Sequence, residues 1–357
     1  MAKIAVGMSG GVDSSVAAAL LQAAGHEVVG VTLALWRGSL CCSFEDVARA
    51  KEVARQLGIR HFLIEALDDF RSQIVEPFVV ARLQGQTPNP CVWCNQLFKF
   101  GLLWEQLQQK DPEISALASG HYARLSLNPQ TQRQEVFMGA DPSKDQSYML
   151  WRLSQSQLQR ALFPLGALKK SQVREKAQAL GLTELAQKPD SQDLCFVVPT
   201  ADDFWQTHAP QGLIPGEIVH VDGQVHGTHS GRVKYTLGQR RGLGGGSTER
   251  LYVAGVDPVR NLVQVAPREQ LLSARLSLAE VNWVSIPAPE AELRCLFKLS
   301  SQGVPVSGLL HLSSDKTATV QLDAPHMPVG QGQSVVFYDS TDRLLGGGIL
   351  TQMRPNS

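Results

Sequence analysis

Residues 3–15, KIAVGMSGGVDSS, constrain the fold of this 357-residue chain more than any other stretch. The apolar, β-branched residues 4–6 predict a buried strand. The run stops at Ser9-Gly10-Gly11, and from Asp13 onward the apolar residues follow helical spacing. A strand, a glycine turn and a helix start in this order present backbone N–H groups to a phosphate. We therefore expect a βαβ unit whose first turn binds an anion.

Each residue type in this turn suits a pyrophosphate. Gly10 and Gly11 let the backbone take positive φ and approach a phosphate without an intervening Cβ. The serines at positions 9, 14 and 15 add hydroxyl donors, and Asp13 is placed to hold Mg²⁺ against the phosphates. No Walker-A lysine follows, which argues against a γ-phosphate loop. A Gly-Gly turn alone is also typical of a plain βα connection, but the whole string SGGVDSS resembles the pyrophosphate loop of the ATP pyrophosphatases, which adenylate a substrate oxygen.

The rest of the chain predicts three domains. Apolar runs at 27–35, 61–64 and 114–119 alternate with helical patterns, as in parallel βαβ units, so we expect a doubly wound α/β domain over residues 1–203. From about residue 204 the chain is glycine-rich with short alternating strands, which predicts a small β-rich domain up to residue 273. Six strand-like segments within residues 274–357 predict a C-terminal β-barrel.

The overall charge gives no argument for nucleic-acid binding, since 33 basic and 33 acidic residues balance. Two acid-free basic stretches suggest a surface that faces a polyanion, although either one could be a solvated face. They hold Arg152, Arg160, Lys169, Lys170 and Arg174 in the first, and Arg232, Lys234, Arg240 and Arg241 in the second.

No apolar run is long enough for a membrane span, and the chain opens on a strand instead of a signal peptide. We therefore expect a cytoplasmic protein with no membrane partner.

In such a protein the cysteines predict chemistry rather than a disulfide framework. Cys91 and Cys94 form a C-x-x-C within residues 86–95, which we expect to be a proline-rich loop before a helix from residue 96. That spacing allows a redox pair, half of a zinc site or part of an iron–sulfur site.

The other four cysteines differ in setting. Cys195 lies in a polar loop, where a reactive thiol is expected. Cys41 and Cys42 are adjacent, a poor spacing for two ligands of one metal, and we expect buried thiols beside the second strand. Cys295 lies in the middle of a predicted barrel strand and is expected to be a core residue.

With an adenylating loop, a thiol pair and a third thiol, the chain resembles the tRNA-specific 2-thiouridylases, which replace the 2-oxygen of the wobble uridine with sulfur. The matching strings span nearly the whole chain in family order. They are GMSGGVDSS (7–15), CCSFEDV (41–47), TPNPCVWCN (87–95), SGHYAR (119–124), KDQSYML (144–150), KPDSQDLCF (188–196), YTLGQRRGLG (235–244), VVFY (335–338) and LLGGGI (344–349).

The resemblance implies roles for residues of the first domain. The turn and its flanking residues match the ATP-binding loop of the family. They are Gly7, Met8, Ser9, Gly10, Gly11, Val12, Asp13 and Ser14. Leu33 matches a residue of the adenine pocket and Gly120 a backbone contact to the nucleotide. Cys94 matches the nucleophile and Cys195 the persulfide carrier. Cys91 stands where some members carry an aspartate that is a candidate general acid or base, so a thiol takes that place here.

The resemblance also implies tRNA as the partner, of the lysine, glutamate and glutamine types. The implied contacts are Asn89, Pro90 and Cys91 around the target base, His121, the turn Lys144-Asp145-Gln146, and Arg294 and Gln333 in the barrel. Arg240 and Arg241 from the second basic stretch complete the expected RNA surface of the central domain.

Two sulfur routes fit these residues. In the first, a sulfur carrier or cysteine desulfurase loads Cys195 with a persulfide, and Cys94 attacks it and leaves a Cys94–Cys195 disulfide for a reductant. A helix start at Asn95 would favour the Cys94 thiolate through its dipole. In the second, Cys91, Cys94 and Cys195 hold a [4Fe–4S] cluster whose open iron binds the sulfide.

Two further hypotheses belong to other classes of protein. One is an ATP-pyrophosphatase ligase that uses ammonia, against which the cysteine pair argues because such chemistry needs no thiol near the substrate. The other is an RNA-binding adaptor with an inactive nucleotide fold, against which the intact SGGVDS argues.

Overall fold

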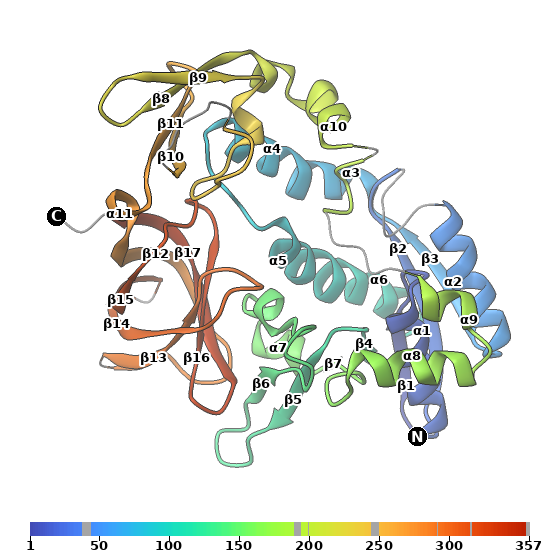
Figure 1. Ribbon diagram of the computed structural model, residues 1–357. Coiled ribbons are helices and arrows are strands. Elements are labelled where there is room, and N and C mark those ends of the chain that lie inside the picture. The colour runs from blue at the N-terminus through green and yellow to red at the C-terminus, as the bar shows by residue number, and fades with distance from the viewer. Residues whose placement is uncertain are drawn as a thin grey trace.

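Within its described part the chain forms three sheets, of five, four and eight strands (Figure 1). The computed structural model describes residues 1–37, 44–188, 194–198, 200–243, 250–290, 292–314 and 316–354. Cys41 and Cys42 lie outside the described residues. None of the described helices is long and apolar enough to cross a bilayer.

The first sheet is parallel and has the strand order β3-β2-β1-β4-β7. Its strands are β1 (Lys3–Gly7), β2 (Glu27–Ala34), β3 (Arg60–Glu65), β4 (Ile114–Ala118) and β7 (Ala161–Leu162). Along β1, Ile4 and Val6 join the core on one face and Ala5 the core on the other, as the period of two requires. Both faces are therefore buried, which explains the continuous apolar runs.

Helices cover each face of this sheet, so the predicted doubly wound α/β fold is confirmed. One face packs against α1 (Val12–Ala23), α2 (Phe44–Gln56), α8 (Lys170–Ala179) and α9 (Thr183–Gln187). The other packs against α3 (Leu67–Phe70), the π-helical η1 (Arg71–Val75), α4 (Glu76–Leu83) and the helical run of residues 90–110. Shorter helices are η3 (Ser147–Leu150), α7 (Gln155–Leu158), α10 (Ala201–His208), η4 (Pro210–Leu213), η5 (Arg232–Lys234) and α11 (Arg268–Leu271).

The expected loop over residues 86–95 is wrong in its second half, because a helix begins at Pro90. The run consists of α5 (Pro90–Cys94), the π-helical η2 (Asn95–Leu102) and α6 (Leu103–Lys110). Pro90 stands at the first helical position, where a missing N–H costs no hydrogen bond and the fixed φ suits a helix. The proline that argued against a helix thus starts one, and both cysteines of the C-x-x-C lie on it.

The second sheet has the order β10-β11-β8-β9 and confirms the small central β-rich domain. Its strands are β8 (Gly216–His220), β9 (Val225–His229), β10 (Leu251–Asp257) and β11 (Leu262–Pro267). Its core is small and includes Ile218, Val253, Val263 and Val265, all fully buried. A core of this size supplies little stability alone, so interactions with neighbouring elements matter.

Arg82 on α4 links this domain to the first through several hydrogen bonds. Its guanidinium, 8% exposed, donates hydrogen bonds of 2.5–3.4 Å to the Val233 and Tyr235 carbonyls, the Thr236 hydroxyl, the Gln86 carbonyl and the Thr87 hydroxyl. Burial lowers the pKa of Arg82 to about 10, which leaves the group charged at neutral pH. The same side chain therefore fixes η5 and the segment that leads into the cysteine helix.

Replacing Arg82 with methionine is expected to lower the free energy of unfolding by about 3 kcal/mol, since several buried oxygens would be deprived of a charged donor. Equilibrium unfolding of the full chain in urea measures the change. Arg71→Met is the matched control, because Arg71 is 63% exposed and its ion pair with Glu76 contributes little. Equal stability of the two variants would show that Arg82 does not hold the domains together.

The third sheet contains the predicted six-stranded barrel, which closes because β12 pairs with both β15 and β17. Its strands are β12 (Ser273–Trp283), β13 (Leu293–Lys298), β14 (Val306–Ser314), β15 (Thr317–His326), β16 (Ser334–Tyr338) and β17 (Arg343–Arg354). Cys295 is a buried core residue, as expected, and burial raises its pKa to about 12.

A hairpin from the first 150 residues extends the barrel sheet. Strands β5 (Ala123–Leu127) and β6 (Gln134–Met138) pair with each other, and β6 pairs with β17. A buried ion pair between Asp145 and Lys298 of β13, at 3.3 Å, lies at the same junction. The barrel is therefore packed directly onto the first domain (Figure 1).

Candidate active site

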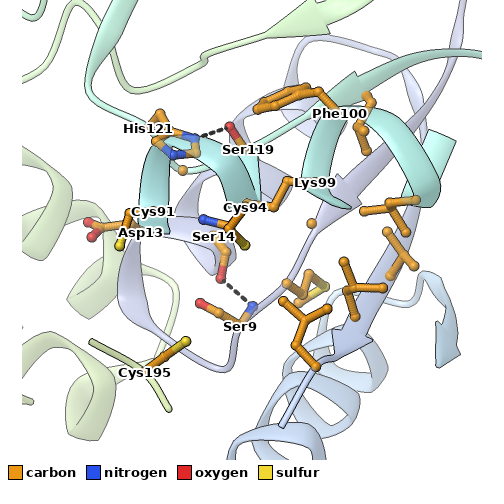
Figure 2. Close-up of a pocket in the computed structure, with 18 of the residues that line it drawn as sticks. Ser9, Asp13, Ser14, Cys91, Cys94, Lys99, Phe100, Ser119, His121 and Cys195 are labelled. Atoms are coloured by element: carbon orange, nitrogen blue, oxygen red, sulfur yellow. Dashed lines mark hydrogen bonds between the residues drawn. The ribbon is translucent and has the colours of Figure 1, made fainter. Parts of the chain in front are cut away.

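A cavity of about 350 Å³ opens at the carboxyl ends of β1, β2 and β4, where ligands enter such sheets (Figure 2). Most of the residues expected to bind ATP line it, together with all three cysteines expected to carry chemistry. These are Gly7, Met8, Ser9, Asp13, Ser14, Leu33, Gly120, Cys91, Cys94 and Cys195. Residues from the beginning and from the end of the first domain's sequence therefore line the same cavity.

The glycine turn has the geometry of a phosphate site. Gly10 has a φ of +70°, and a Cβ there would collide with the Asp46 carbonyl, so only glycine fits. Gly11 was expected to share the positive φ but has a φ of −97° and is the N-cap of α1. No side chain caps this helix start, so Val12 and its neighbours present N–H groups outward.

The serines brace the turn. The Ser9 N–H donates to the Ser14 hydroxyl at 3.2 Å, and the hydroxyls of Ser14 and Ser15 donate to the Gly11 carbonyl at 3.2 and 2.9 Å. Gly120 approaches this helix start closely, since a Cβ there would lie 2.9 Å from the Ser14 nitrogen. The loop after β4 therefore forms one wall of the cavity because position 120 has no side chain.

Asp13 is held by two partners that the sequence did not indicate. The Tyr122 hydroxyl donates to its carboxylate at 2.7 Å, and the Lys170 ammonium lies 2.8 Å from both carboxylate oxygens. Lys170 is only 8% exposed, whereas the Asp13 side chain is 32% exposed toward the cavity. A cation thus lies beside the turn in a protein that lacks a Walker-A lysine.

Three of the five cations of the first basic stretch make contacts within the fold. Lys170 is buried against Asp13, and the Arg152 guanidinium stacks 3.6 Å from the centre of the Trp93 ring and pairs with Glu280 at 2.9 Å. Arg160 lies over the Trp104 ring. These cations are used inside the fold, which charge spacing in a sequence cannot reveal.

The three cysteines reach the cavity from two elements. Cys91 is half-buried in the first turn of α5, and Cys94, 8% exposed, lies one turn further along. The expected helix start at Asn95 is therefore wrong, and the N-terminal dipole acts on Cys91 more than on Cys94. Cys195 is half-buried and comes from the described segment 194–198.

Phe196 fixes the position of Cys195. It is 2% exposed, and its ring lies 5.3–6.4 Å, centre to centre, from four other aromatic rings. Those rings belong to Trp36, Phe70, Phe78 and Phe204. Such clusters hold a short segment firmly, so the backbone beside Cys195 is anchored at the cavity.

The donors present fit magnesium but not a metal cluster. Asp13 gives one carboxylate next to the phosphate turn, and Mg²⁺ in nucleotide sites typically takes one or two carboxylates together with phosphate oxygens. Among the described residues, however, there is no group of three or more His, Cys, Asp or Glu side chains arranged to hold a metal ion. As placed, the three thiols do not form a ready [4Fe–4S] site.

The residues expected to contact the target base lie at or beside the cavity. Pro90 and His121 line it, and the Asn89 amide contacts the Met149 sulfur at 3.6 Å. The His121 Nδ1 lies 2.7 Å from the Ser119 hydroxyl. Burial, aided by the charge of Lys99, lowers the His121 pKa to about 3, so the ring is neutral at physiological pH.

The turn at residues 144–146 has one inward and two outward positions. Asp145 is 5% exposed, and its carboxylate accepts from the Gly139 and Ser147 N–H groups and pairs with Lys298. Its expected role as an RNA contact is therefore wrong for the side chain, which is structural. Gln146 is exposed and lines the cavity, and Lys144 is half-buried beside it.

The remaining expected RNA contacts lie away from the cavity. Arg240 and Arg241 are exposed on the central domain. Arg294 is 65% exposed in its side chain and pairs with Asp323 at 2.8 Å, and the Gln333 side chain accepts from the Tyr148 hydroxyl at 3.3 Å. The structure does not bring these residues together with the phosphate turn.

Sequence reasoning missed part of the cavity wall. On the wall, the sequence did not indicate Lys99, Phe100, Ser119 and Phe196. It also did not indicate Tyr122 and Lys170, which are the two buried partners of Asp13. Ser119 and Tyr122 lie in the string SGHYAR, so position after a strand end could have indicated them. Nothing in the local sequence of Lys99 or Lys170 distinguishes them from surface lysines.

Comparison with known proteins covers the whole chain. Three family models match: the tRNA methyl transferase HUP domain over residues 2–199, the tRNA methyl transferase PRC-barrel domain over 202–267 and the aminomethyltransferase beta-barrel domain over 273–350. The chain is 42% identical over 357 residues to the tRNA-specific 2-thiouridylase MnmA of Chloroflexus aggregans, covering 98% of both chains. It is 44% identical over 351 residues to that of Trichlorobacter lovleyi, covering 98% of this chain and 97% of the relative.

Proposed function

The chain belongs to the family of the tRNA-specific 2-thiouridylases, and from this membership we propose that its cavity adenylates the 2-oxygen of the wobble uridine and replaces it with sulfur. The enzyme is accordingly a tRNA sulfurtransferase. One observation carries the proposal: a single cavity is lined by a phosphate turn and by three cysteines. Methyl transfer, which two of the matching domain descriptions mention, needs neither feature.

Adenylation is needed because the 2-oxygen belongs to a resonance-stabilised carbonyl and is a poor leaving group. The oxygen attacks the α-phosphorus of ATP, pyrophosphate departs, and the oxygen then carries AMP. In this step the uncapped start of α1, which follows Gly10 and Gly11, would donate N–H groups to the departing pyrophosphate. Leu33 and Gly120 supply the walls for the nucleoside part.

Asp13 and Lys170 set the charge beside this turn. Asp13 would hold Mg²⁺ that arrives with the nucleotide, and the ion supplies neutralisation of the phosphate charge. Lys170 pairs with both Asp13 oxygens and so fixes the carboxylate beside the turn. Tyr122 keeps the carboxylate in place through its hydroxyl.

Sulfur transfer then uses the thiols. Cys195 carries a persulfide delivered by a sulfur carrier or cysteine desulfurase. The Cys94 thiolate attacks the inner sulfur, a Cys94–Cys195 disulfide forms, and hydrosulfide leaves with the electron pair of the broken S–S bond. Hydrosulfide attacks carbon 2 and AMP departs with the former oxygen. A dithiol reductant returns two electrons and reopens the disulfide.

The uridine must leave the anticodon stack to reach this cavity, as is usual for enzymes that modify a base. His121 is neutral and buried, so it can contact the base without carrying charge. Gln146 on the cavity wall and Asn89 at the start of α5 are polar groups that could contact the base. Tests with unmodified lysine, glutamate and glutamine tRNAs address the expected substrate set.

The decisive experiment gives purified protein ATP, magnesium, a persulfide donor, a reductant and unmodified tRNA. We expect AMP and pyrophosphate to form in step with 2-thiouridine, and only when tRNA is present. Pyrophosphate release with ammonia and a small acceptor would indicate the ligase hypothesis instead. Binding of tRNA without any AMP would indicate an adaptor.

Cys91→Ala tests the sulfur route. We expect thiolation to persist within about tenfold of the parent rate, because in the persulfide scheme Cys91 is neither donor nor nucleophile. Protein purified without air is expected to contain no stoichiometric iron or acid-labile sulfide. If the parent protein holds one cluster per chain, and Cys91→Ala loses both the cluster and the activity, the cluster route replaces the persulfide scheme.

Changing Arg240 and Arg241 to glutamine tests the RNA surface of the central domain. The slope of log affinity against log salt for tRNA is expected to fall by about one unit for each phosphate that the variant no longer neutralises. Filter binding between low and moderate salt measures it. Arg55→Gln is the control, because Arg55 lies on α2 on the far side of the molecule and pairs with Glu52 (Figure 1). An unchanged slope in the double variant would mean that these arginines face solvent.

A further inference from the structure

Lys99 lines the cavity from a helical stretch that is not a regular α-helix. Cys94 and Lys99 are five residues apart, and in an α-helix that spacing turns the second side chain roughly 140° from the first. The π-helical stretch Asn95–Leu102 has i→i+5 hydrogen bonds and more residues per turn, which brings positions i and i+5 closer to one face of the helix. Cys94 and Lys99 therefore both line the cavity, and Figure 2 shows both directed into it.

Gly101 permits this local geometry. A Cβ at Gly101 would lie 2.8 Å from the Gln96 carbonyl oxygen, five residues earlier, so a larger residue would push the wide turn apart. The π stretch is thus fixed by a residue that does not touch the cavity. A π segment costs hydrogen-bond quality, and such segments are frequently found at functional sites.

The location of Lys99 suits a contact with the α-phosphate of the nucleotide. The pyrophosphate turn forms one part of the cavity wall and the thiols another. The α-phosphate must lie between these parts, since it joins the pyrophosphate to the base oxygen that sulfur displaces. Among the described residues on the wall, Lys99 is the one lysine or arginine, and its charge is felt at His121, next to Gly120.

We propose that Lys99 is a further residue of the reaction site, whose ammonium binds the α-phosphate oxygens of the nucleotide. This proposal rests on the proposed adenylation. Lys170 then holds Asp13 beside the turn, and Lys99 binds the phosphate that stays with the base until sulfur attacks.

The test measures the binding of AMP and of inorganic pyrophosphate to the full chain by calorimetry. Lys99→Met removes the charge at similar length and is expected to weaken AMP binding by about 10- to 100-fold, while pyrophosphate binding stays at the parent value. Lys99→Arg is expected to keep AMP affinity within a few fold. Lys110→Met, an exposed lysine at the end of the same helical run, is the matched control.

Parent-like AMP affinity in Lys99→Met would overturn the assignment of Lys99. A parent protein that binds neither AMP nor pyrophosphate would instead overturn the proposed function, so the two failures are distinguishable. Gly101→Ala provides a second variant in which Lys99 remains. We expect its AMP affinity to fall as well, with its unfolding temperature as the folding control, and parent-like affinity would overturn the role of the π stretch.

Discussion

Asp13→Ala is expected to lower the rate of tRNA-dependent AMP formation by about a thousandfold while leaving tRNA affinity unchanged. Among the described residues that line the cavity, Asp13 is the one with a carboxylate. Its removal takes away the protein ligand for magnesium and deprives the buried ammonium of Lys170 of a partner 2.8 Å away. The proposed RNA contacts Arg240 and Arg241 are exposed, are not among the cavity-lining residues and keep their charges.

Rapid-quench measurement of AMP and a parallel tRNA binding titration separate these effects. Asp13→Asn is the companion variant, since it keeps the shape and a hydrogen bond to Tyr122 but not the charge. It should be nearly as impaired as Asp13→Ala if charge is what matters. AMP formation at the parent rate in either variant would contradict the assignment of the glycine turn.

Cys195→Ser separates the two halves of the reaction. Pyrophosphate release in a single turnover should stay within about twofold of the parent, because the phosphate turn is untouched, whereas 2-thiouridine formation should fall by at least about a thousandfold. A serine hydroxyl cannot carry a persulfide or form the disulfide with Cys94. Mass spectrometry of the tRNA nucleosides and a pyrophosphate assay give the two readouts.

Cys295→Ala is the control for removal of a thiol as such. Cys295 is buried in the barrel, away from the cavity, and its raised pKa makes it unreactive. We expect this variant to thiolate tRNA at close to the parent rate. Thiolation by Cys195→Ser at a comparable rate would remove Cys195 from the mechanism.

The parts of the fold that sequence patterns predicted are those encoded locally. The glycine turn, the parallel strands and the closed barrel depend on apolar periodicity and on residues such as Gly10, whose backbone conformation excludes other side chains. The helix start at Pro90 is equally local, yet a proline supports opposite interpretations depending on whether it stands first in a helix or inside one.

The features that sequence patterns did not predict depend on interactions between distant residues. Lys170 and Asp13 are 157 positions apart, and Lys298 and Asp145 are 153 apart, so neither ion pair leaves a trace in charge spacing. The wide helical turn at Lys99 depends on a close approach at Gly101 that emerges only once the backbone is built. Charged residues were therefore the least predictable part of the candidate site.

The buried pair of Asp145 and Lys298 has a consequence for the spacing between the barrel and the cavity. It ties the rim of the cavity, where Gln146 lies, to strand β13 of the barrel. The distance from the barrel to the chemistry is consequently set when the protein folds. In the proposed function, a tRNA that contacts the barrel must span this fixed distance for its base to reach the cavity.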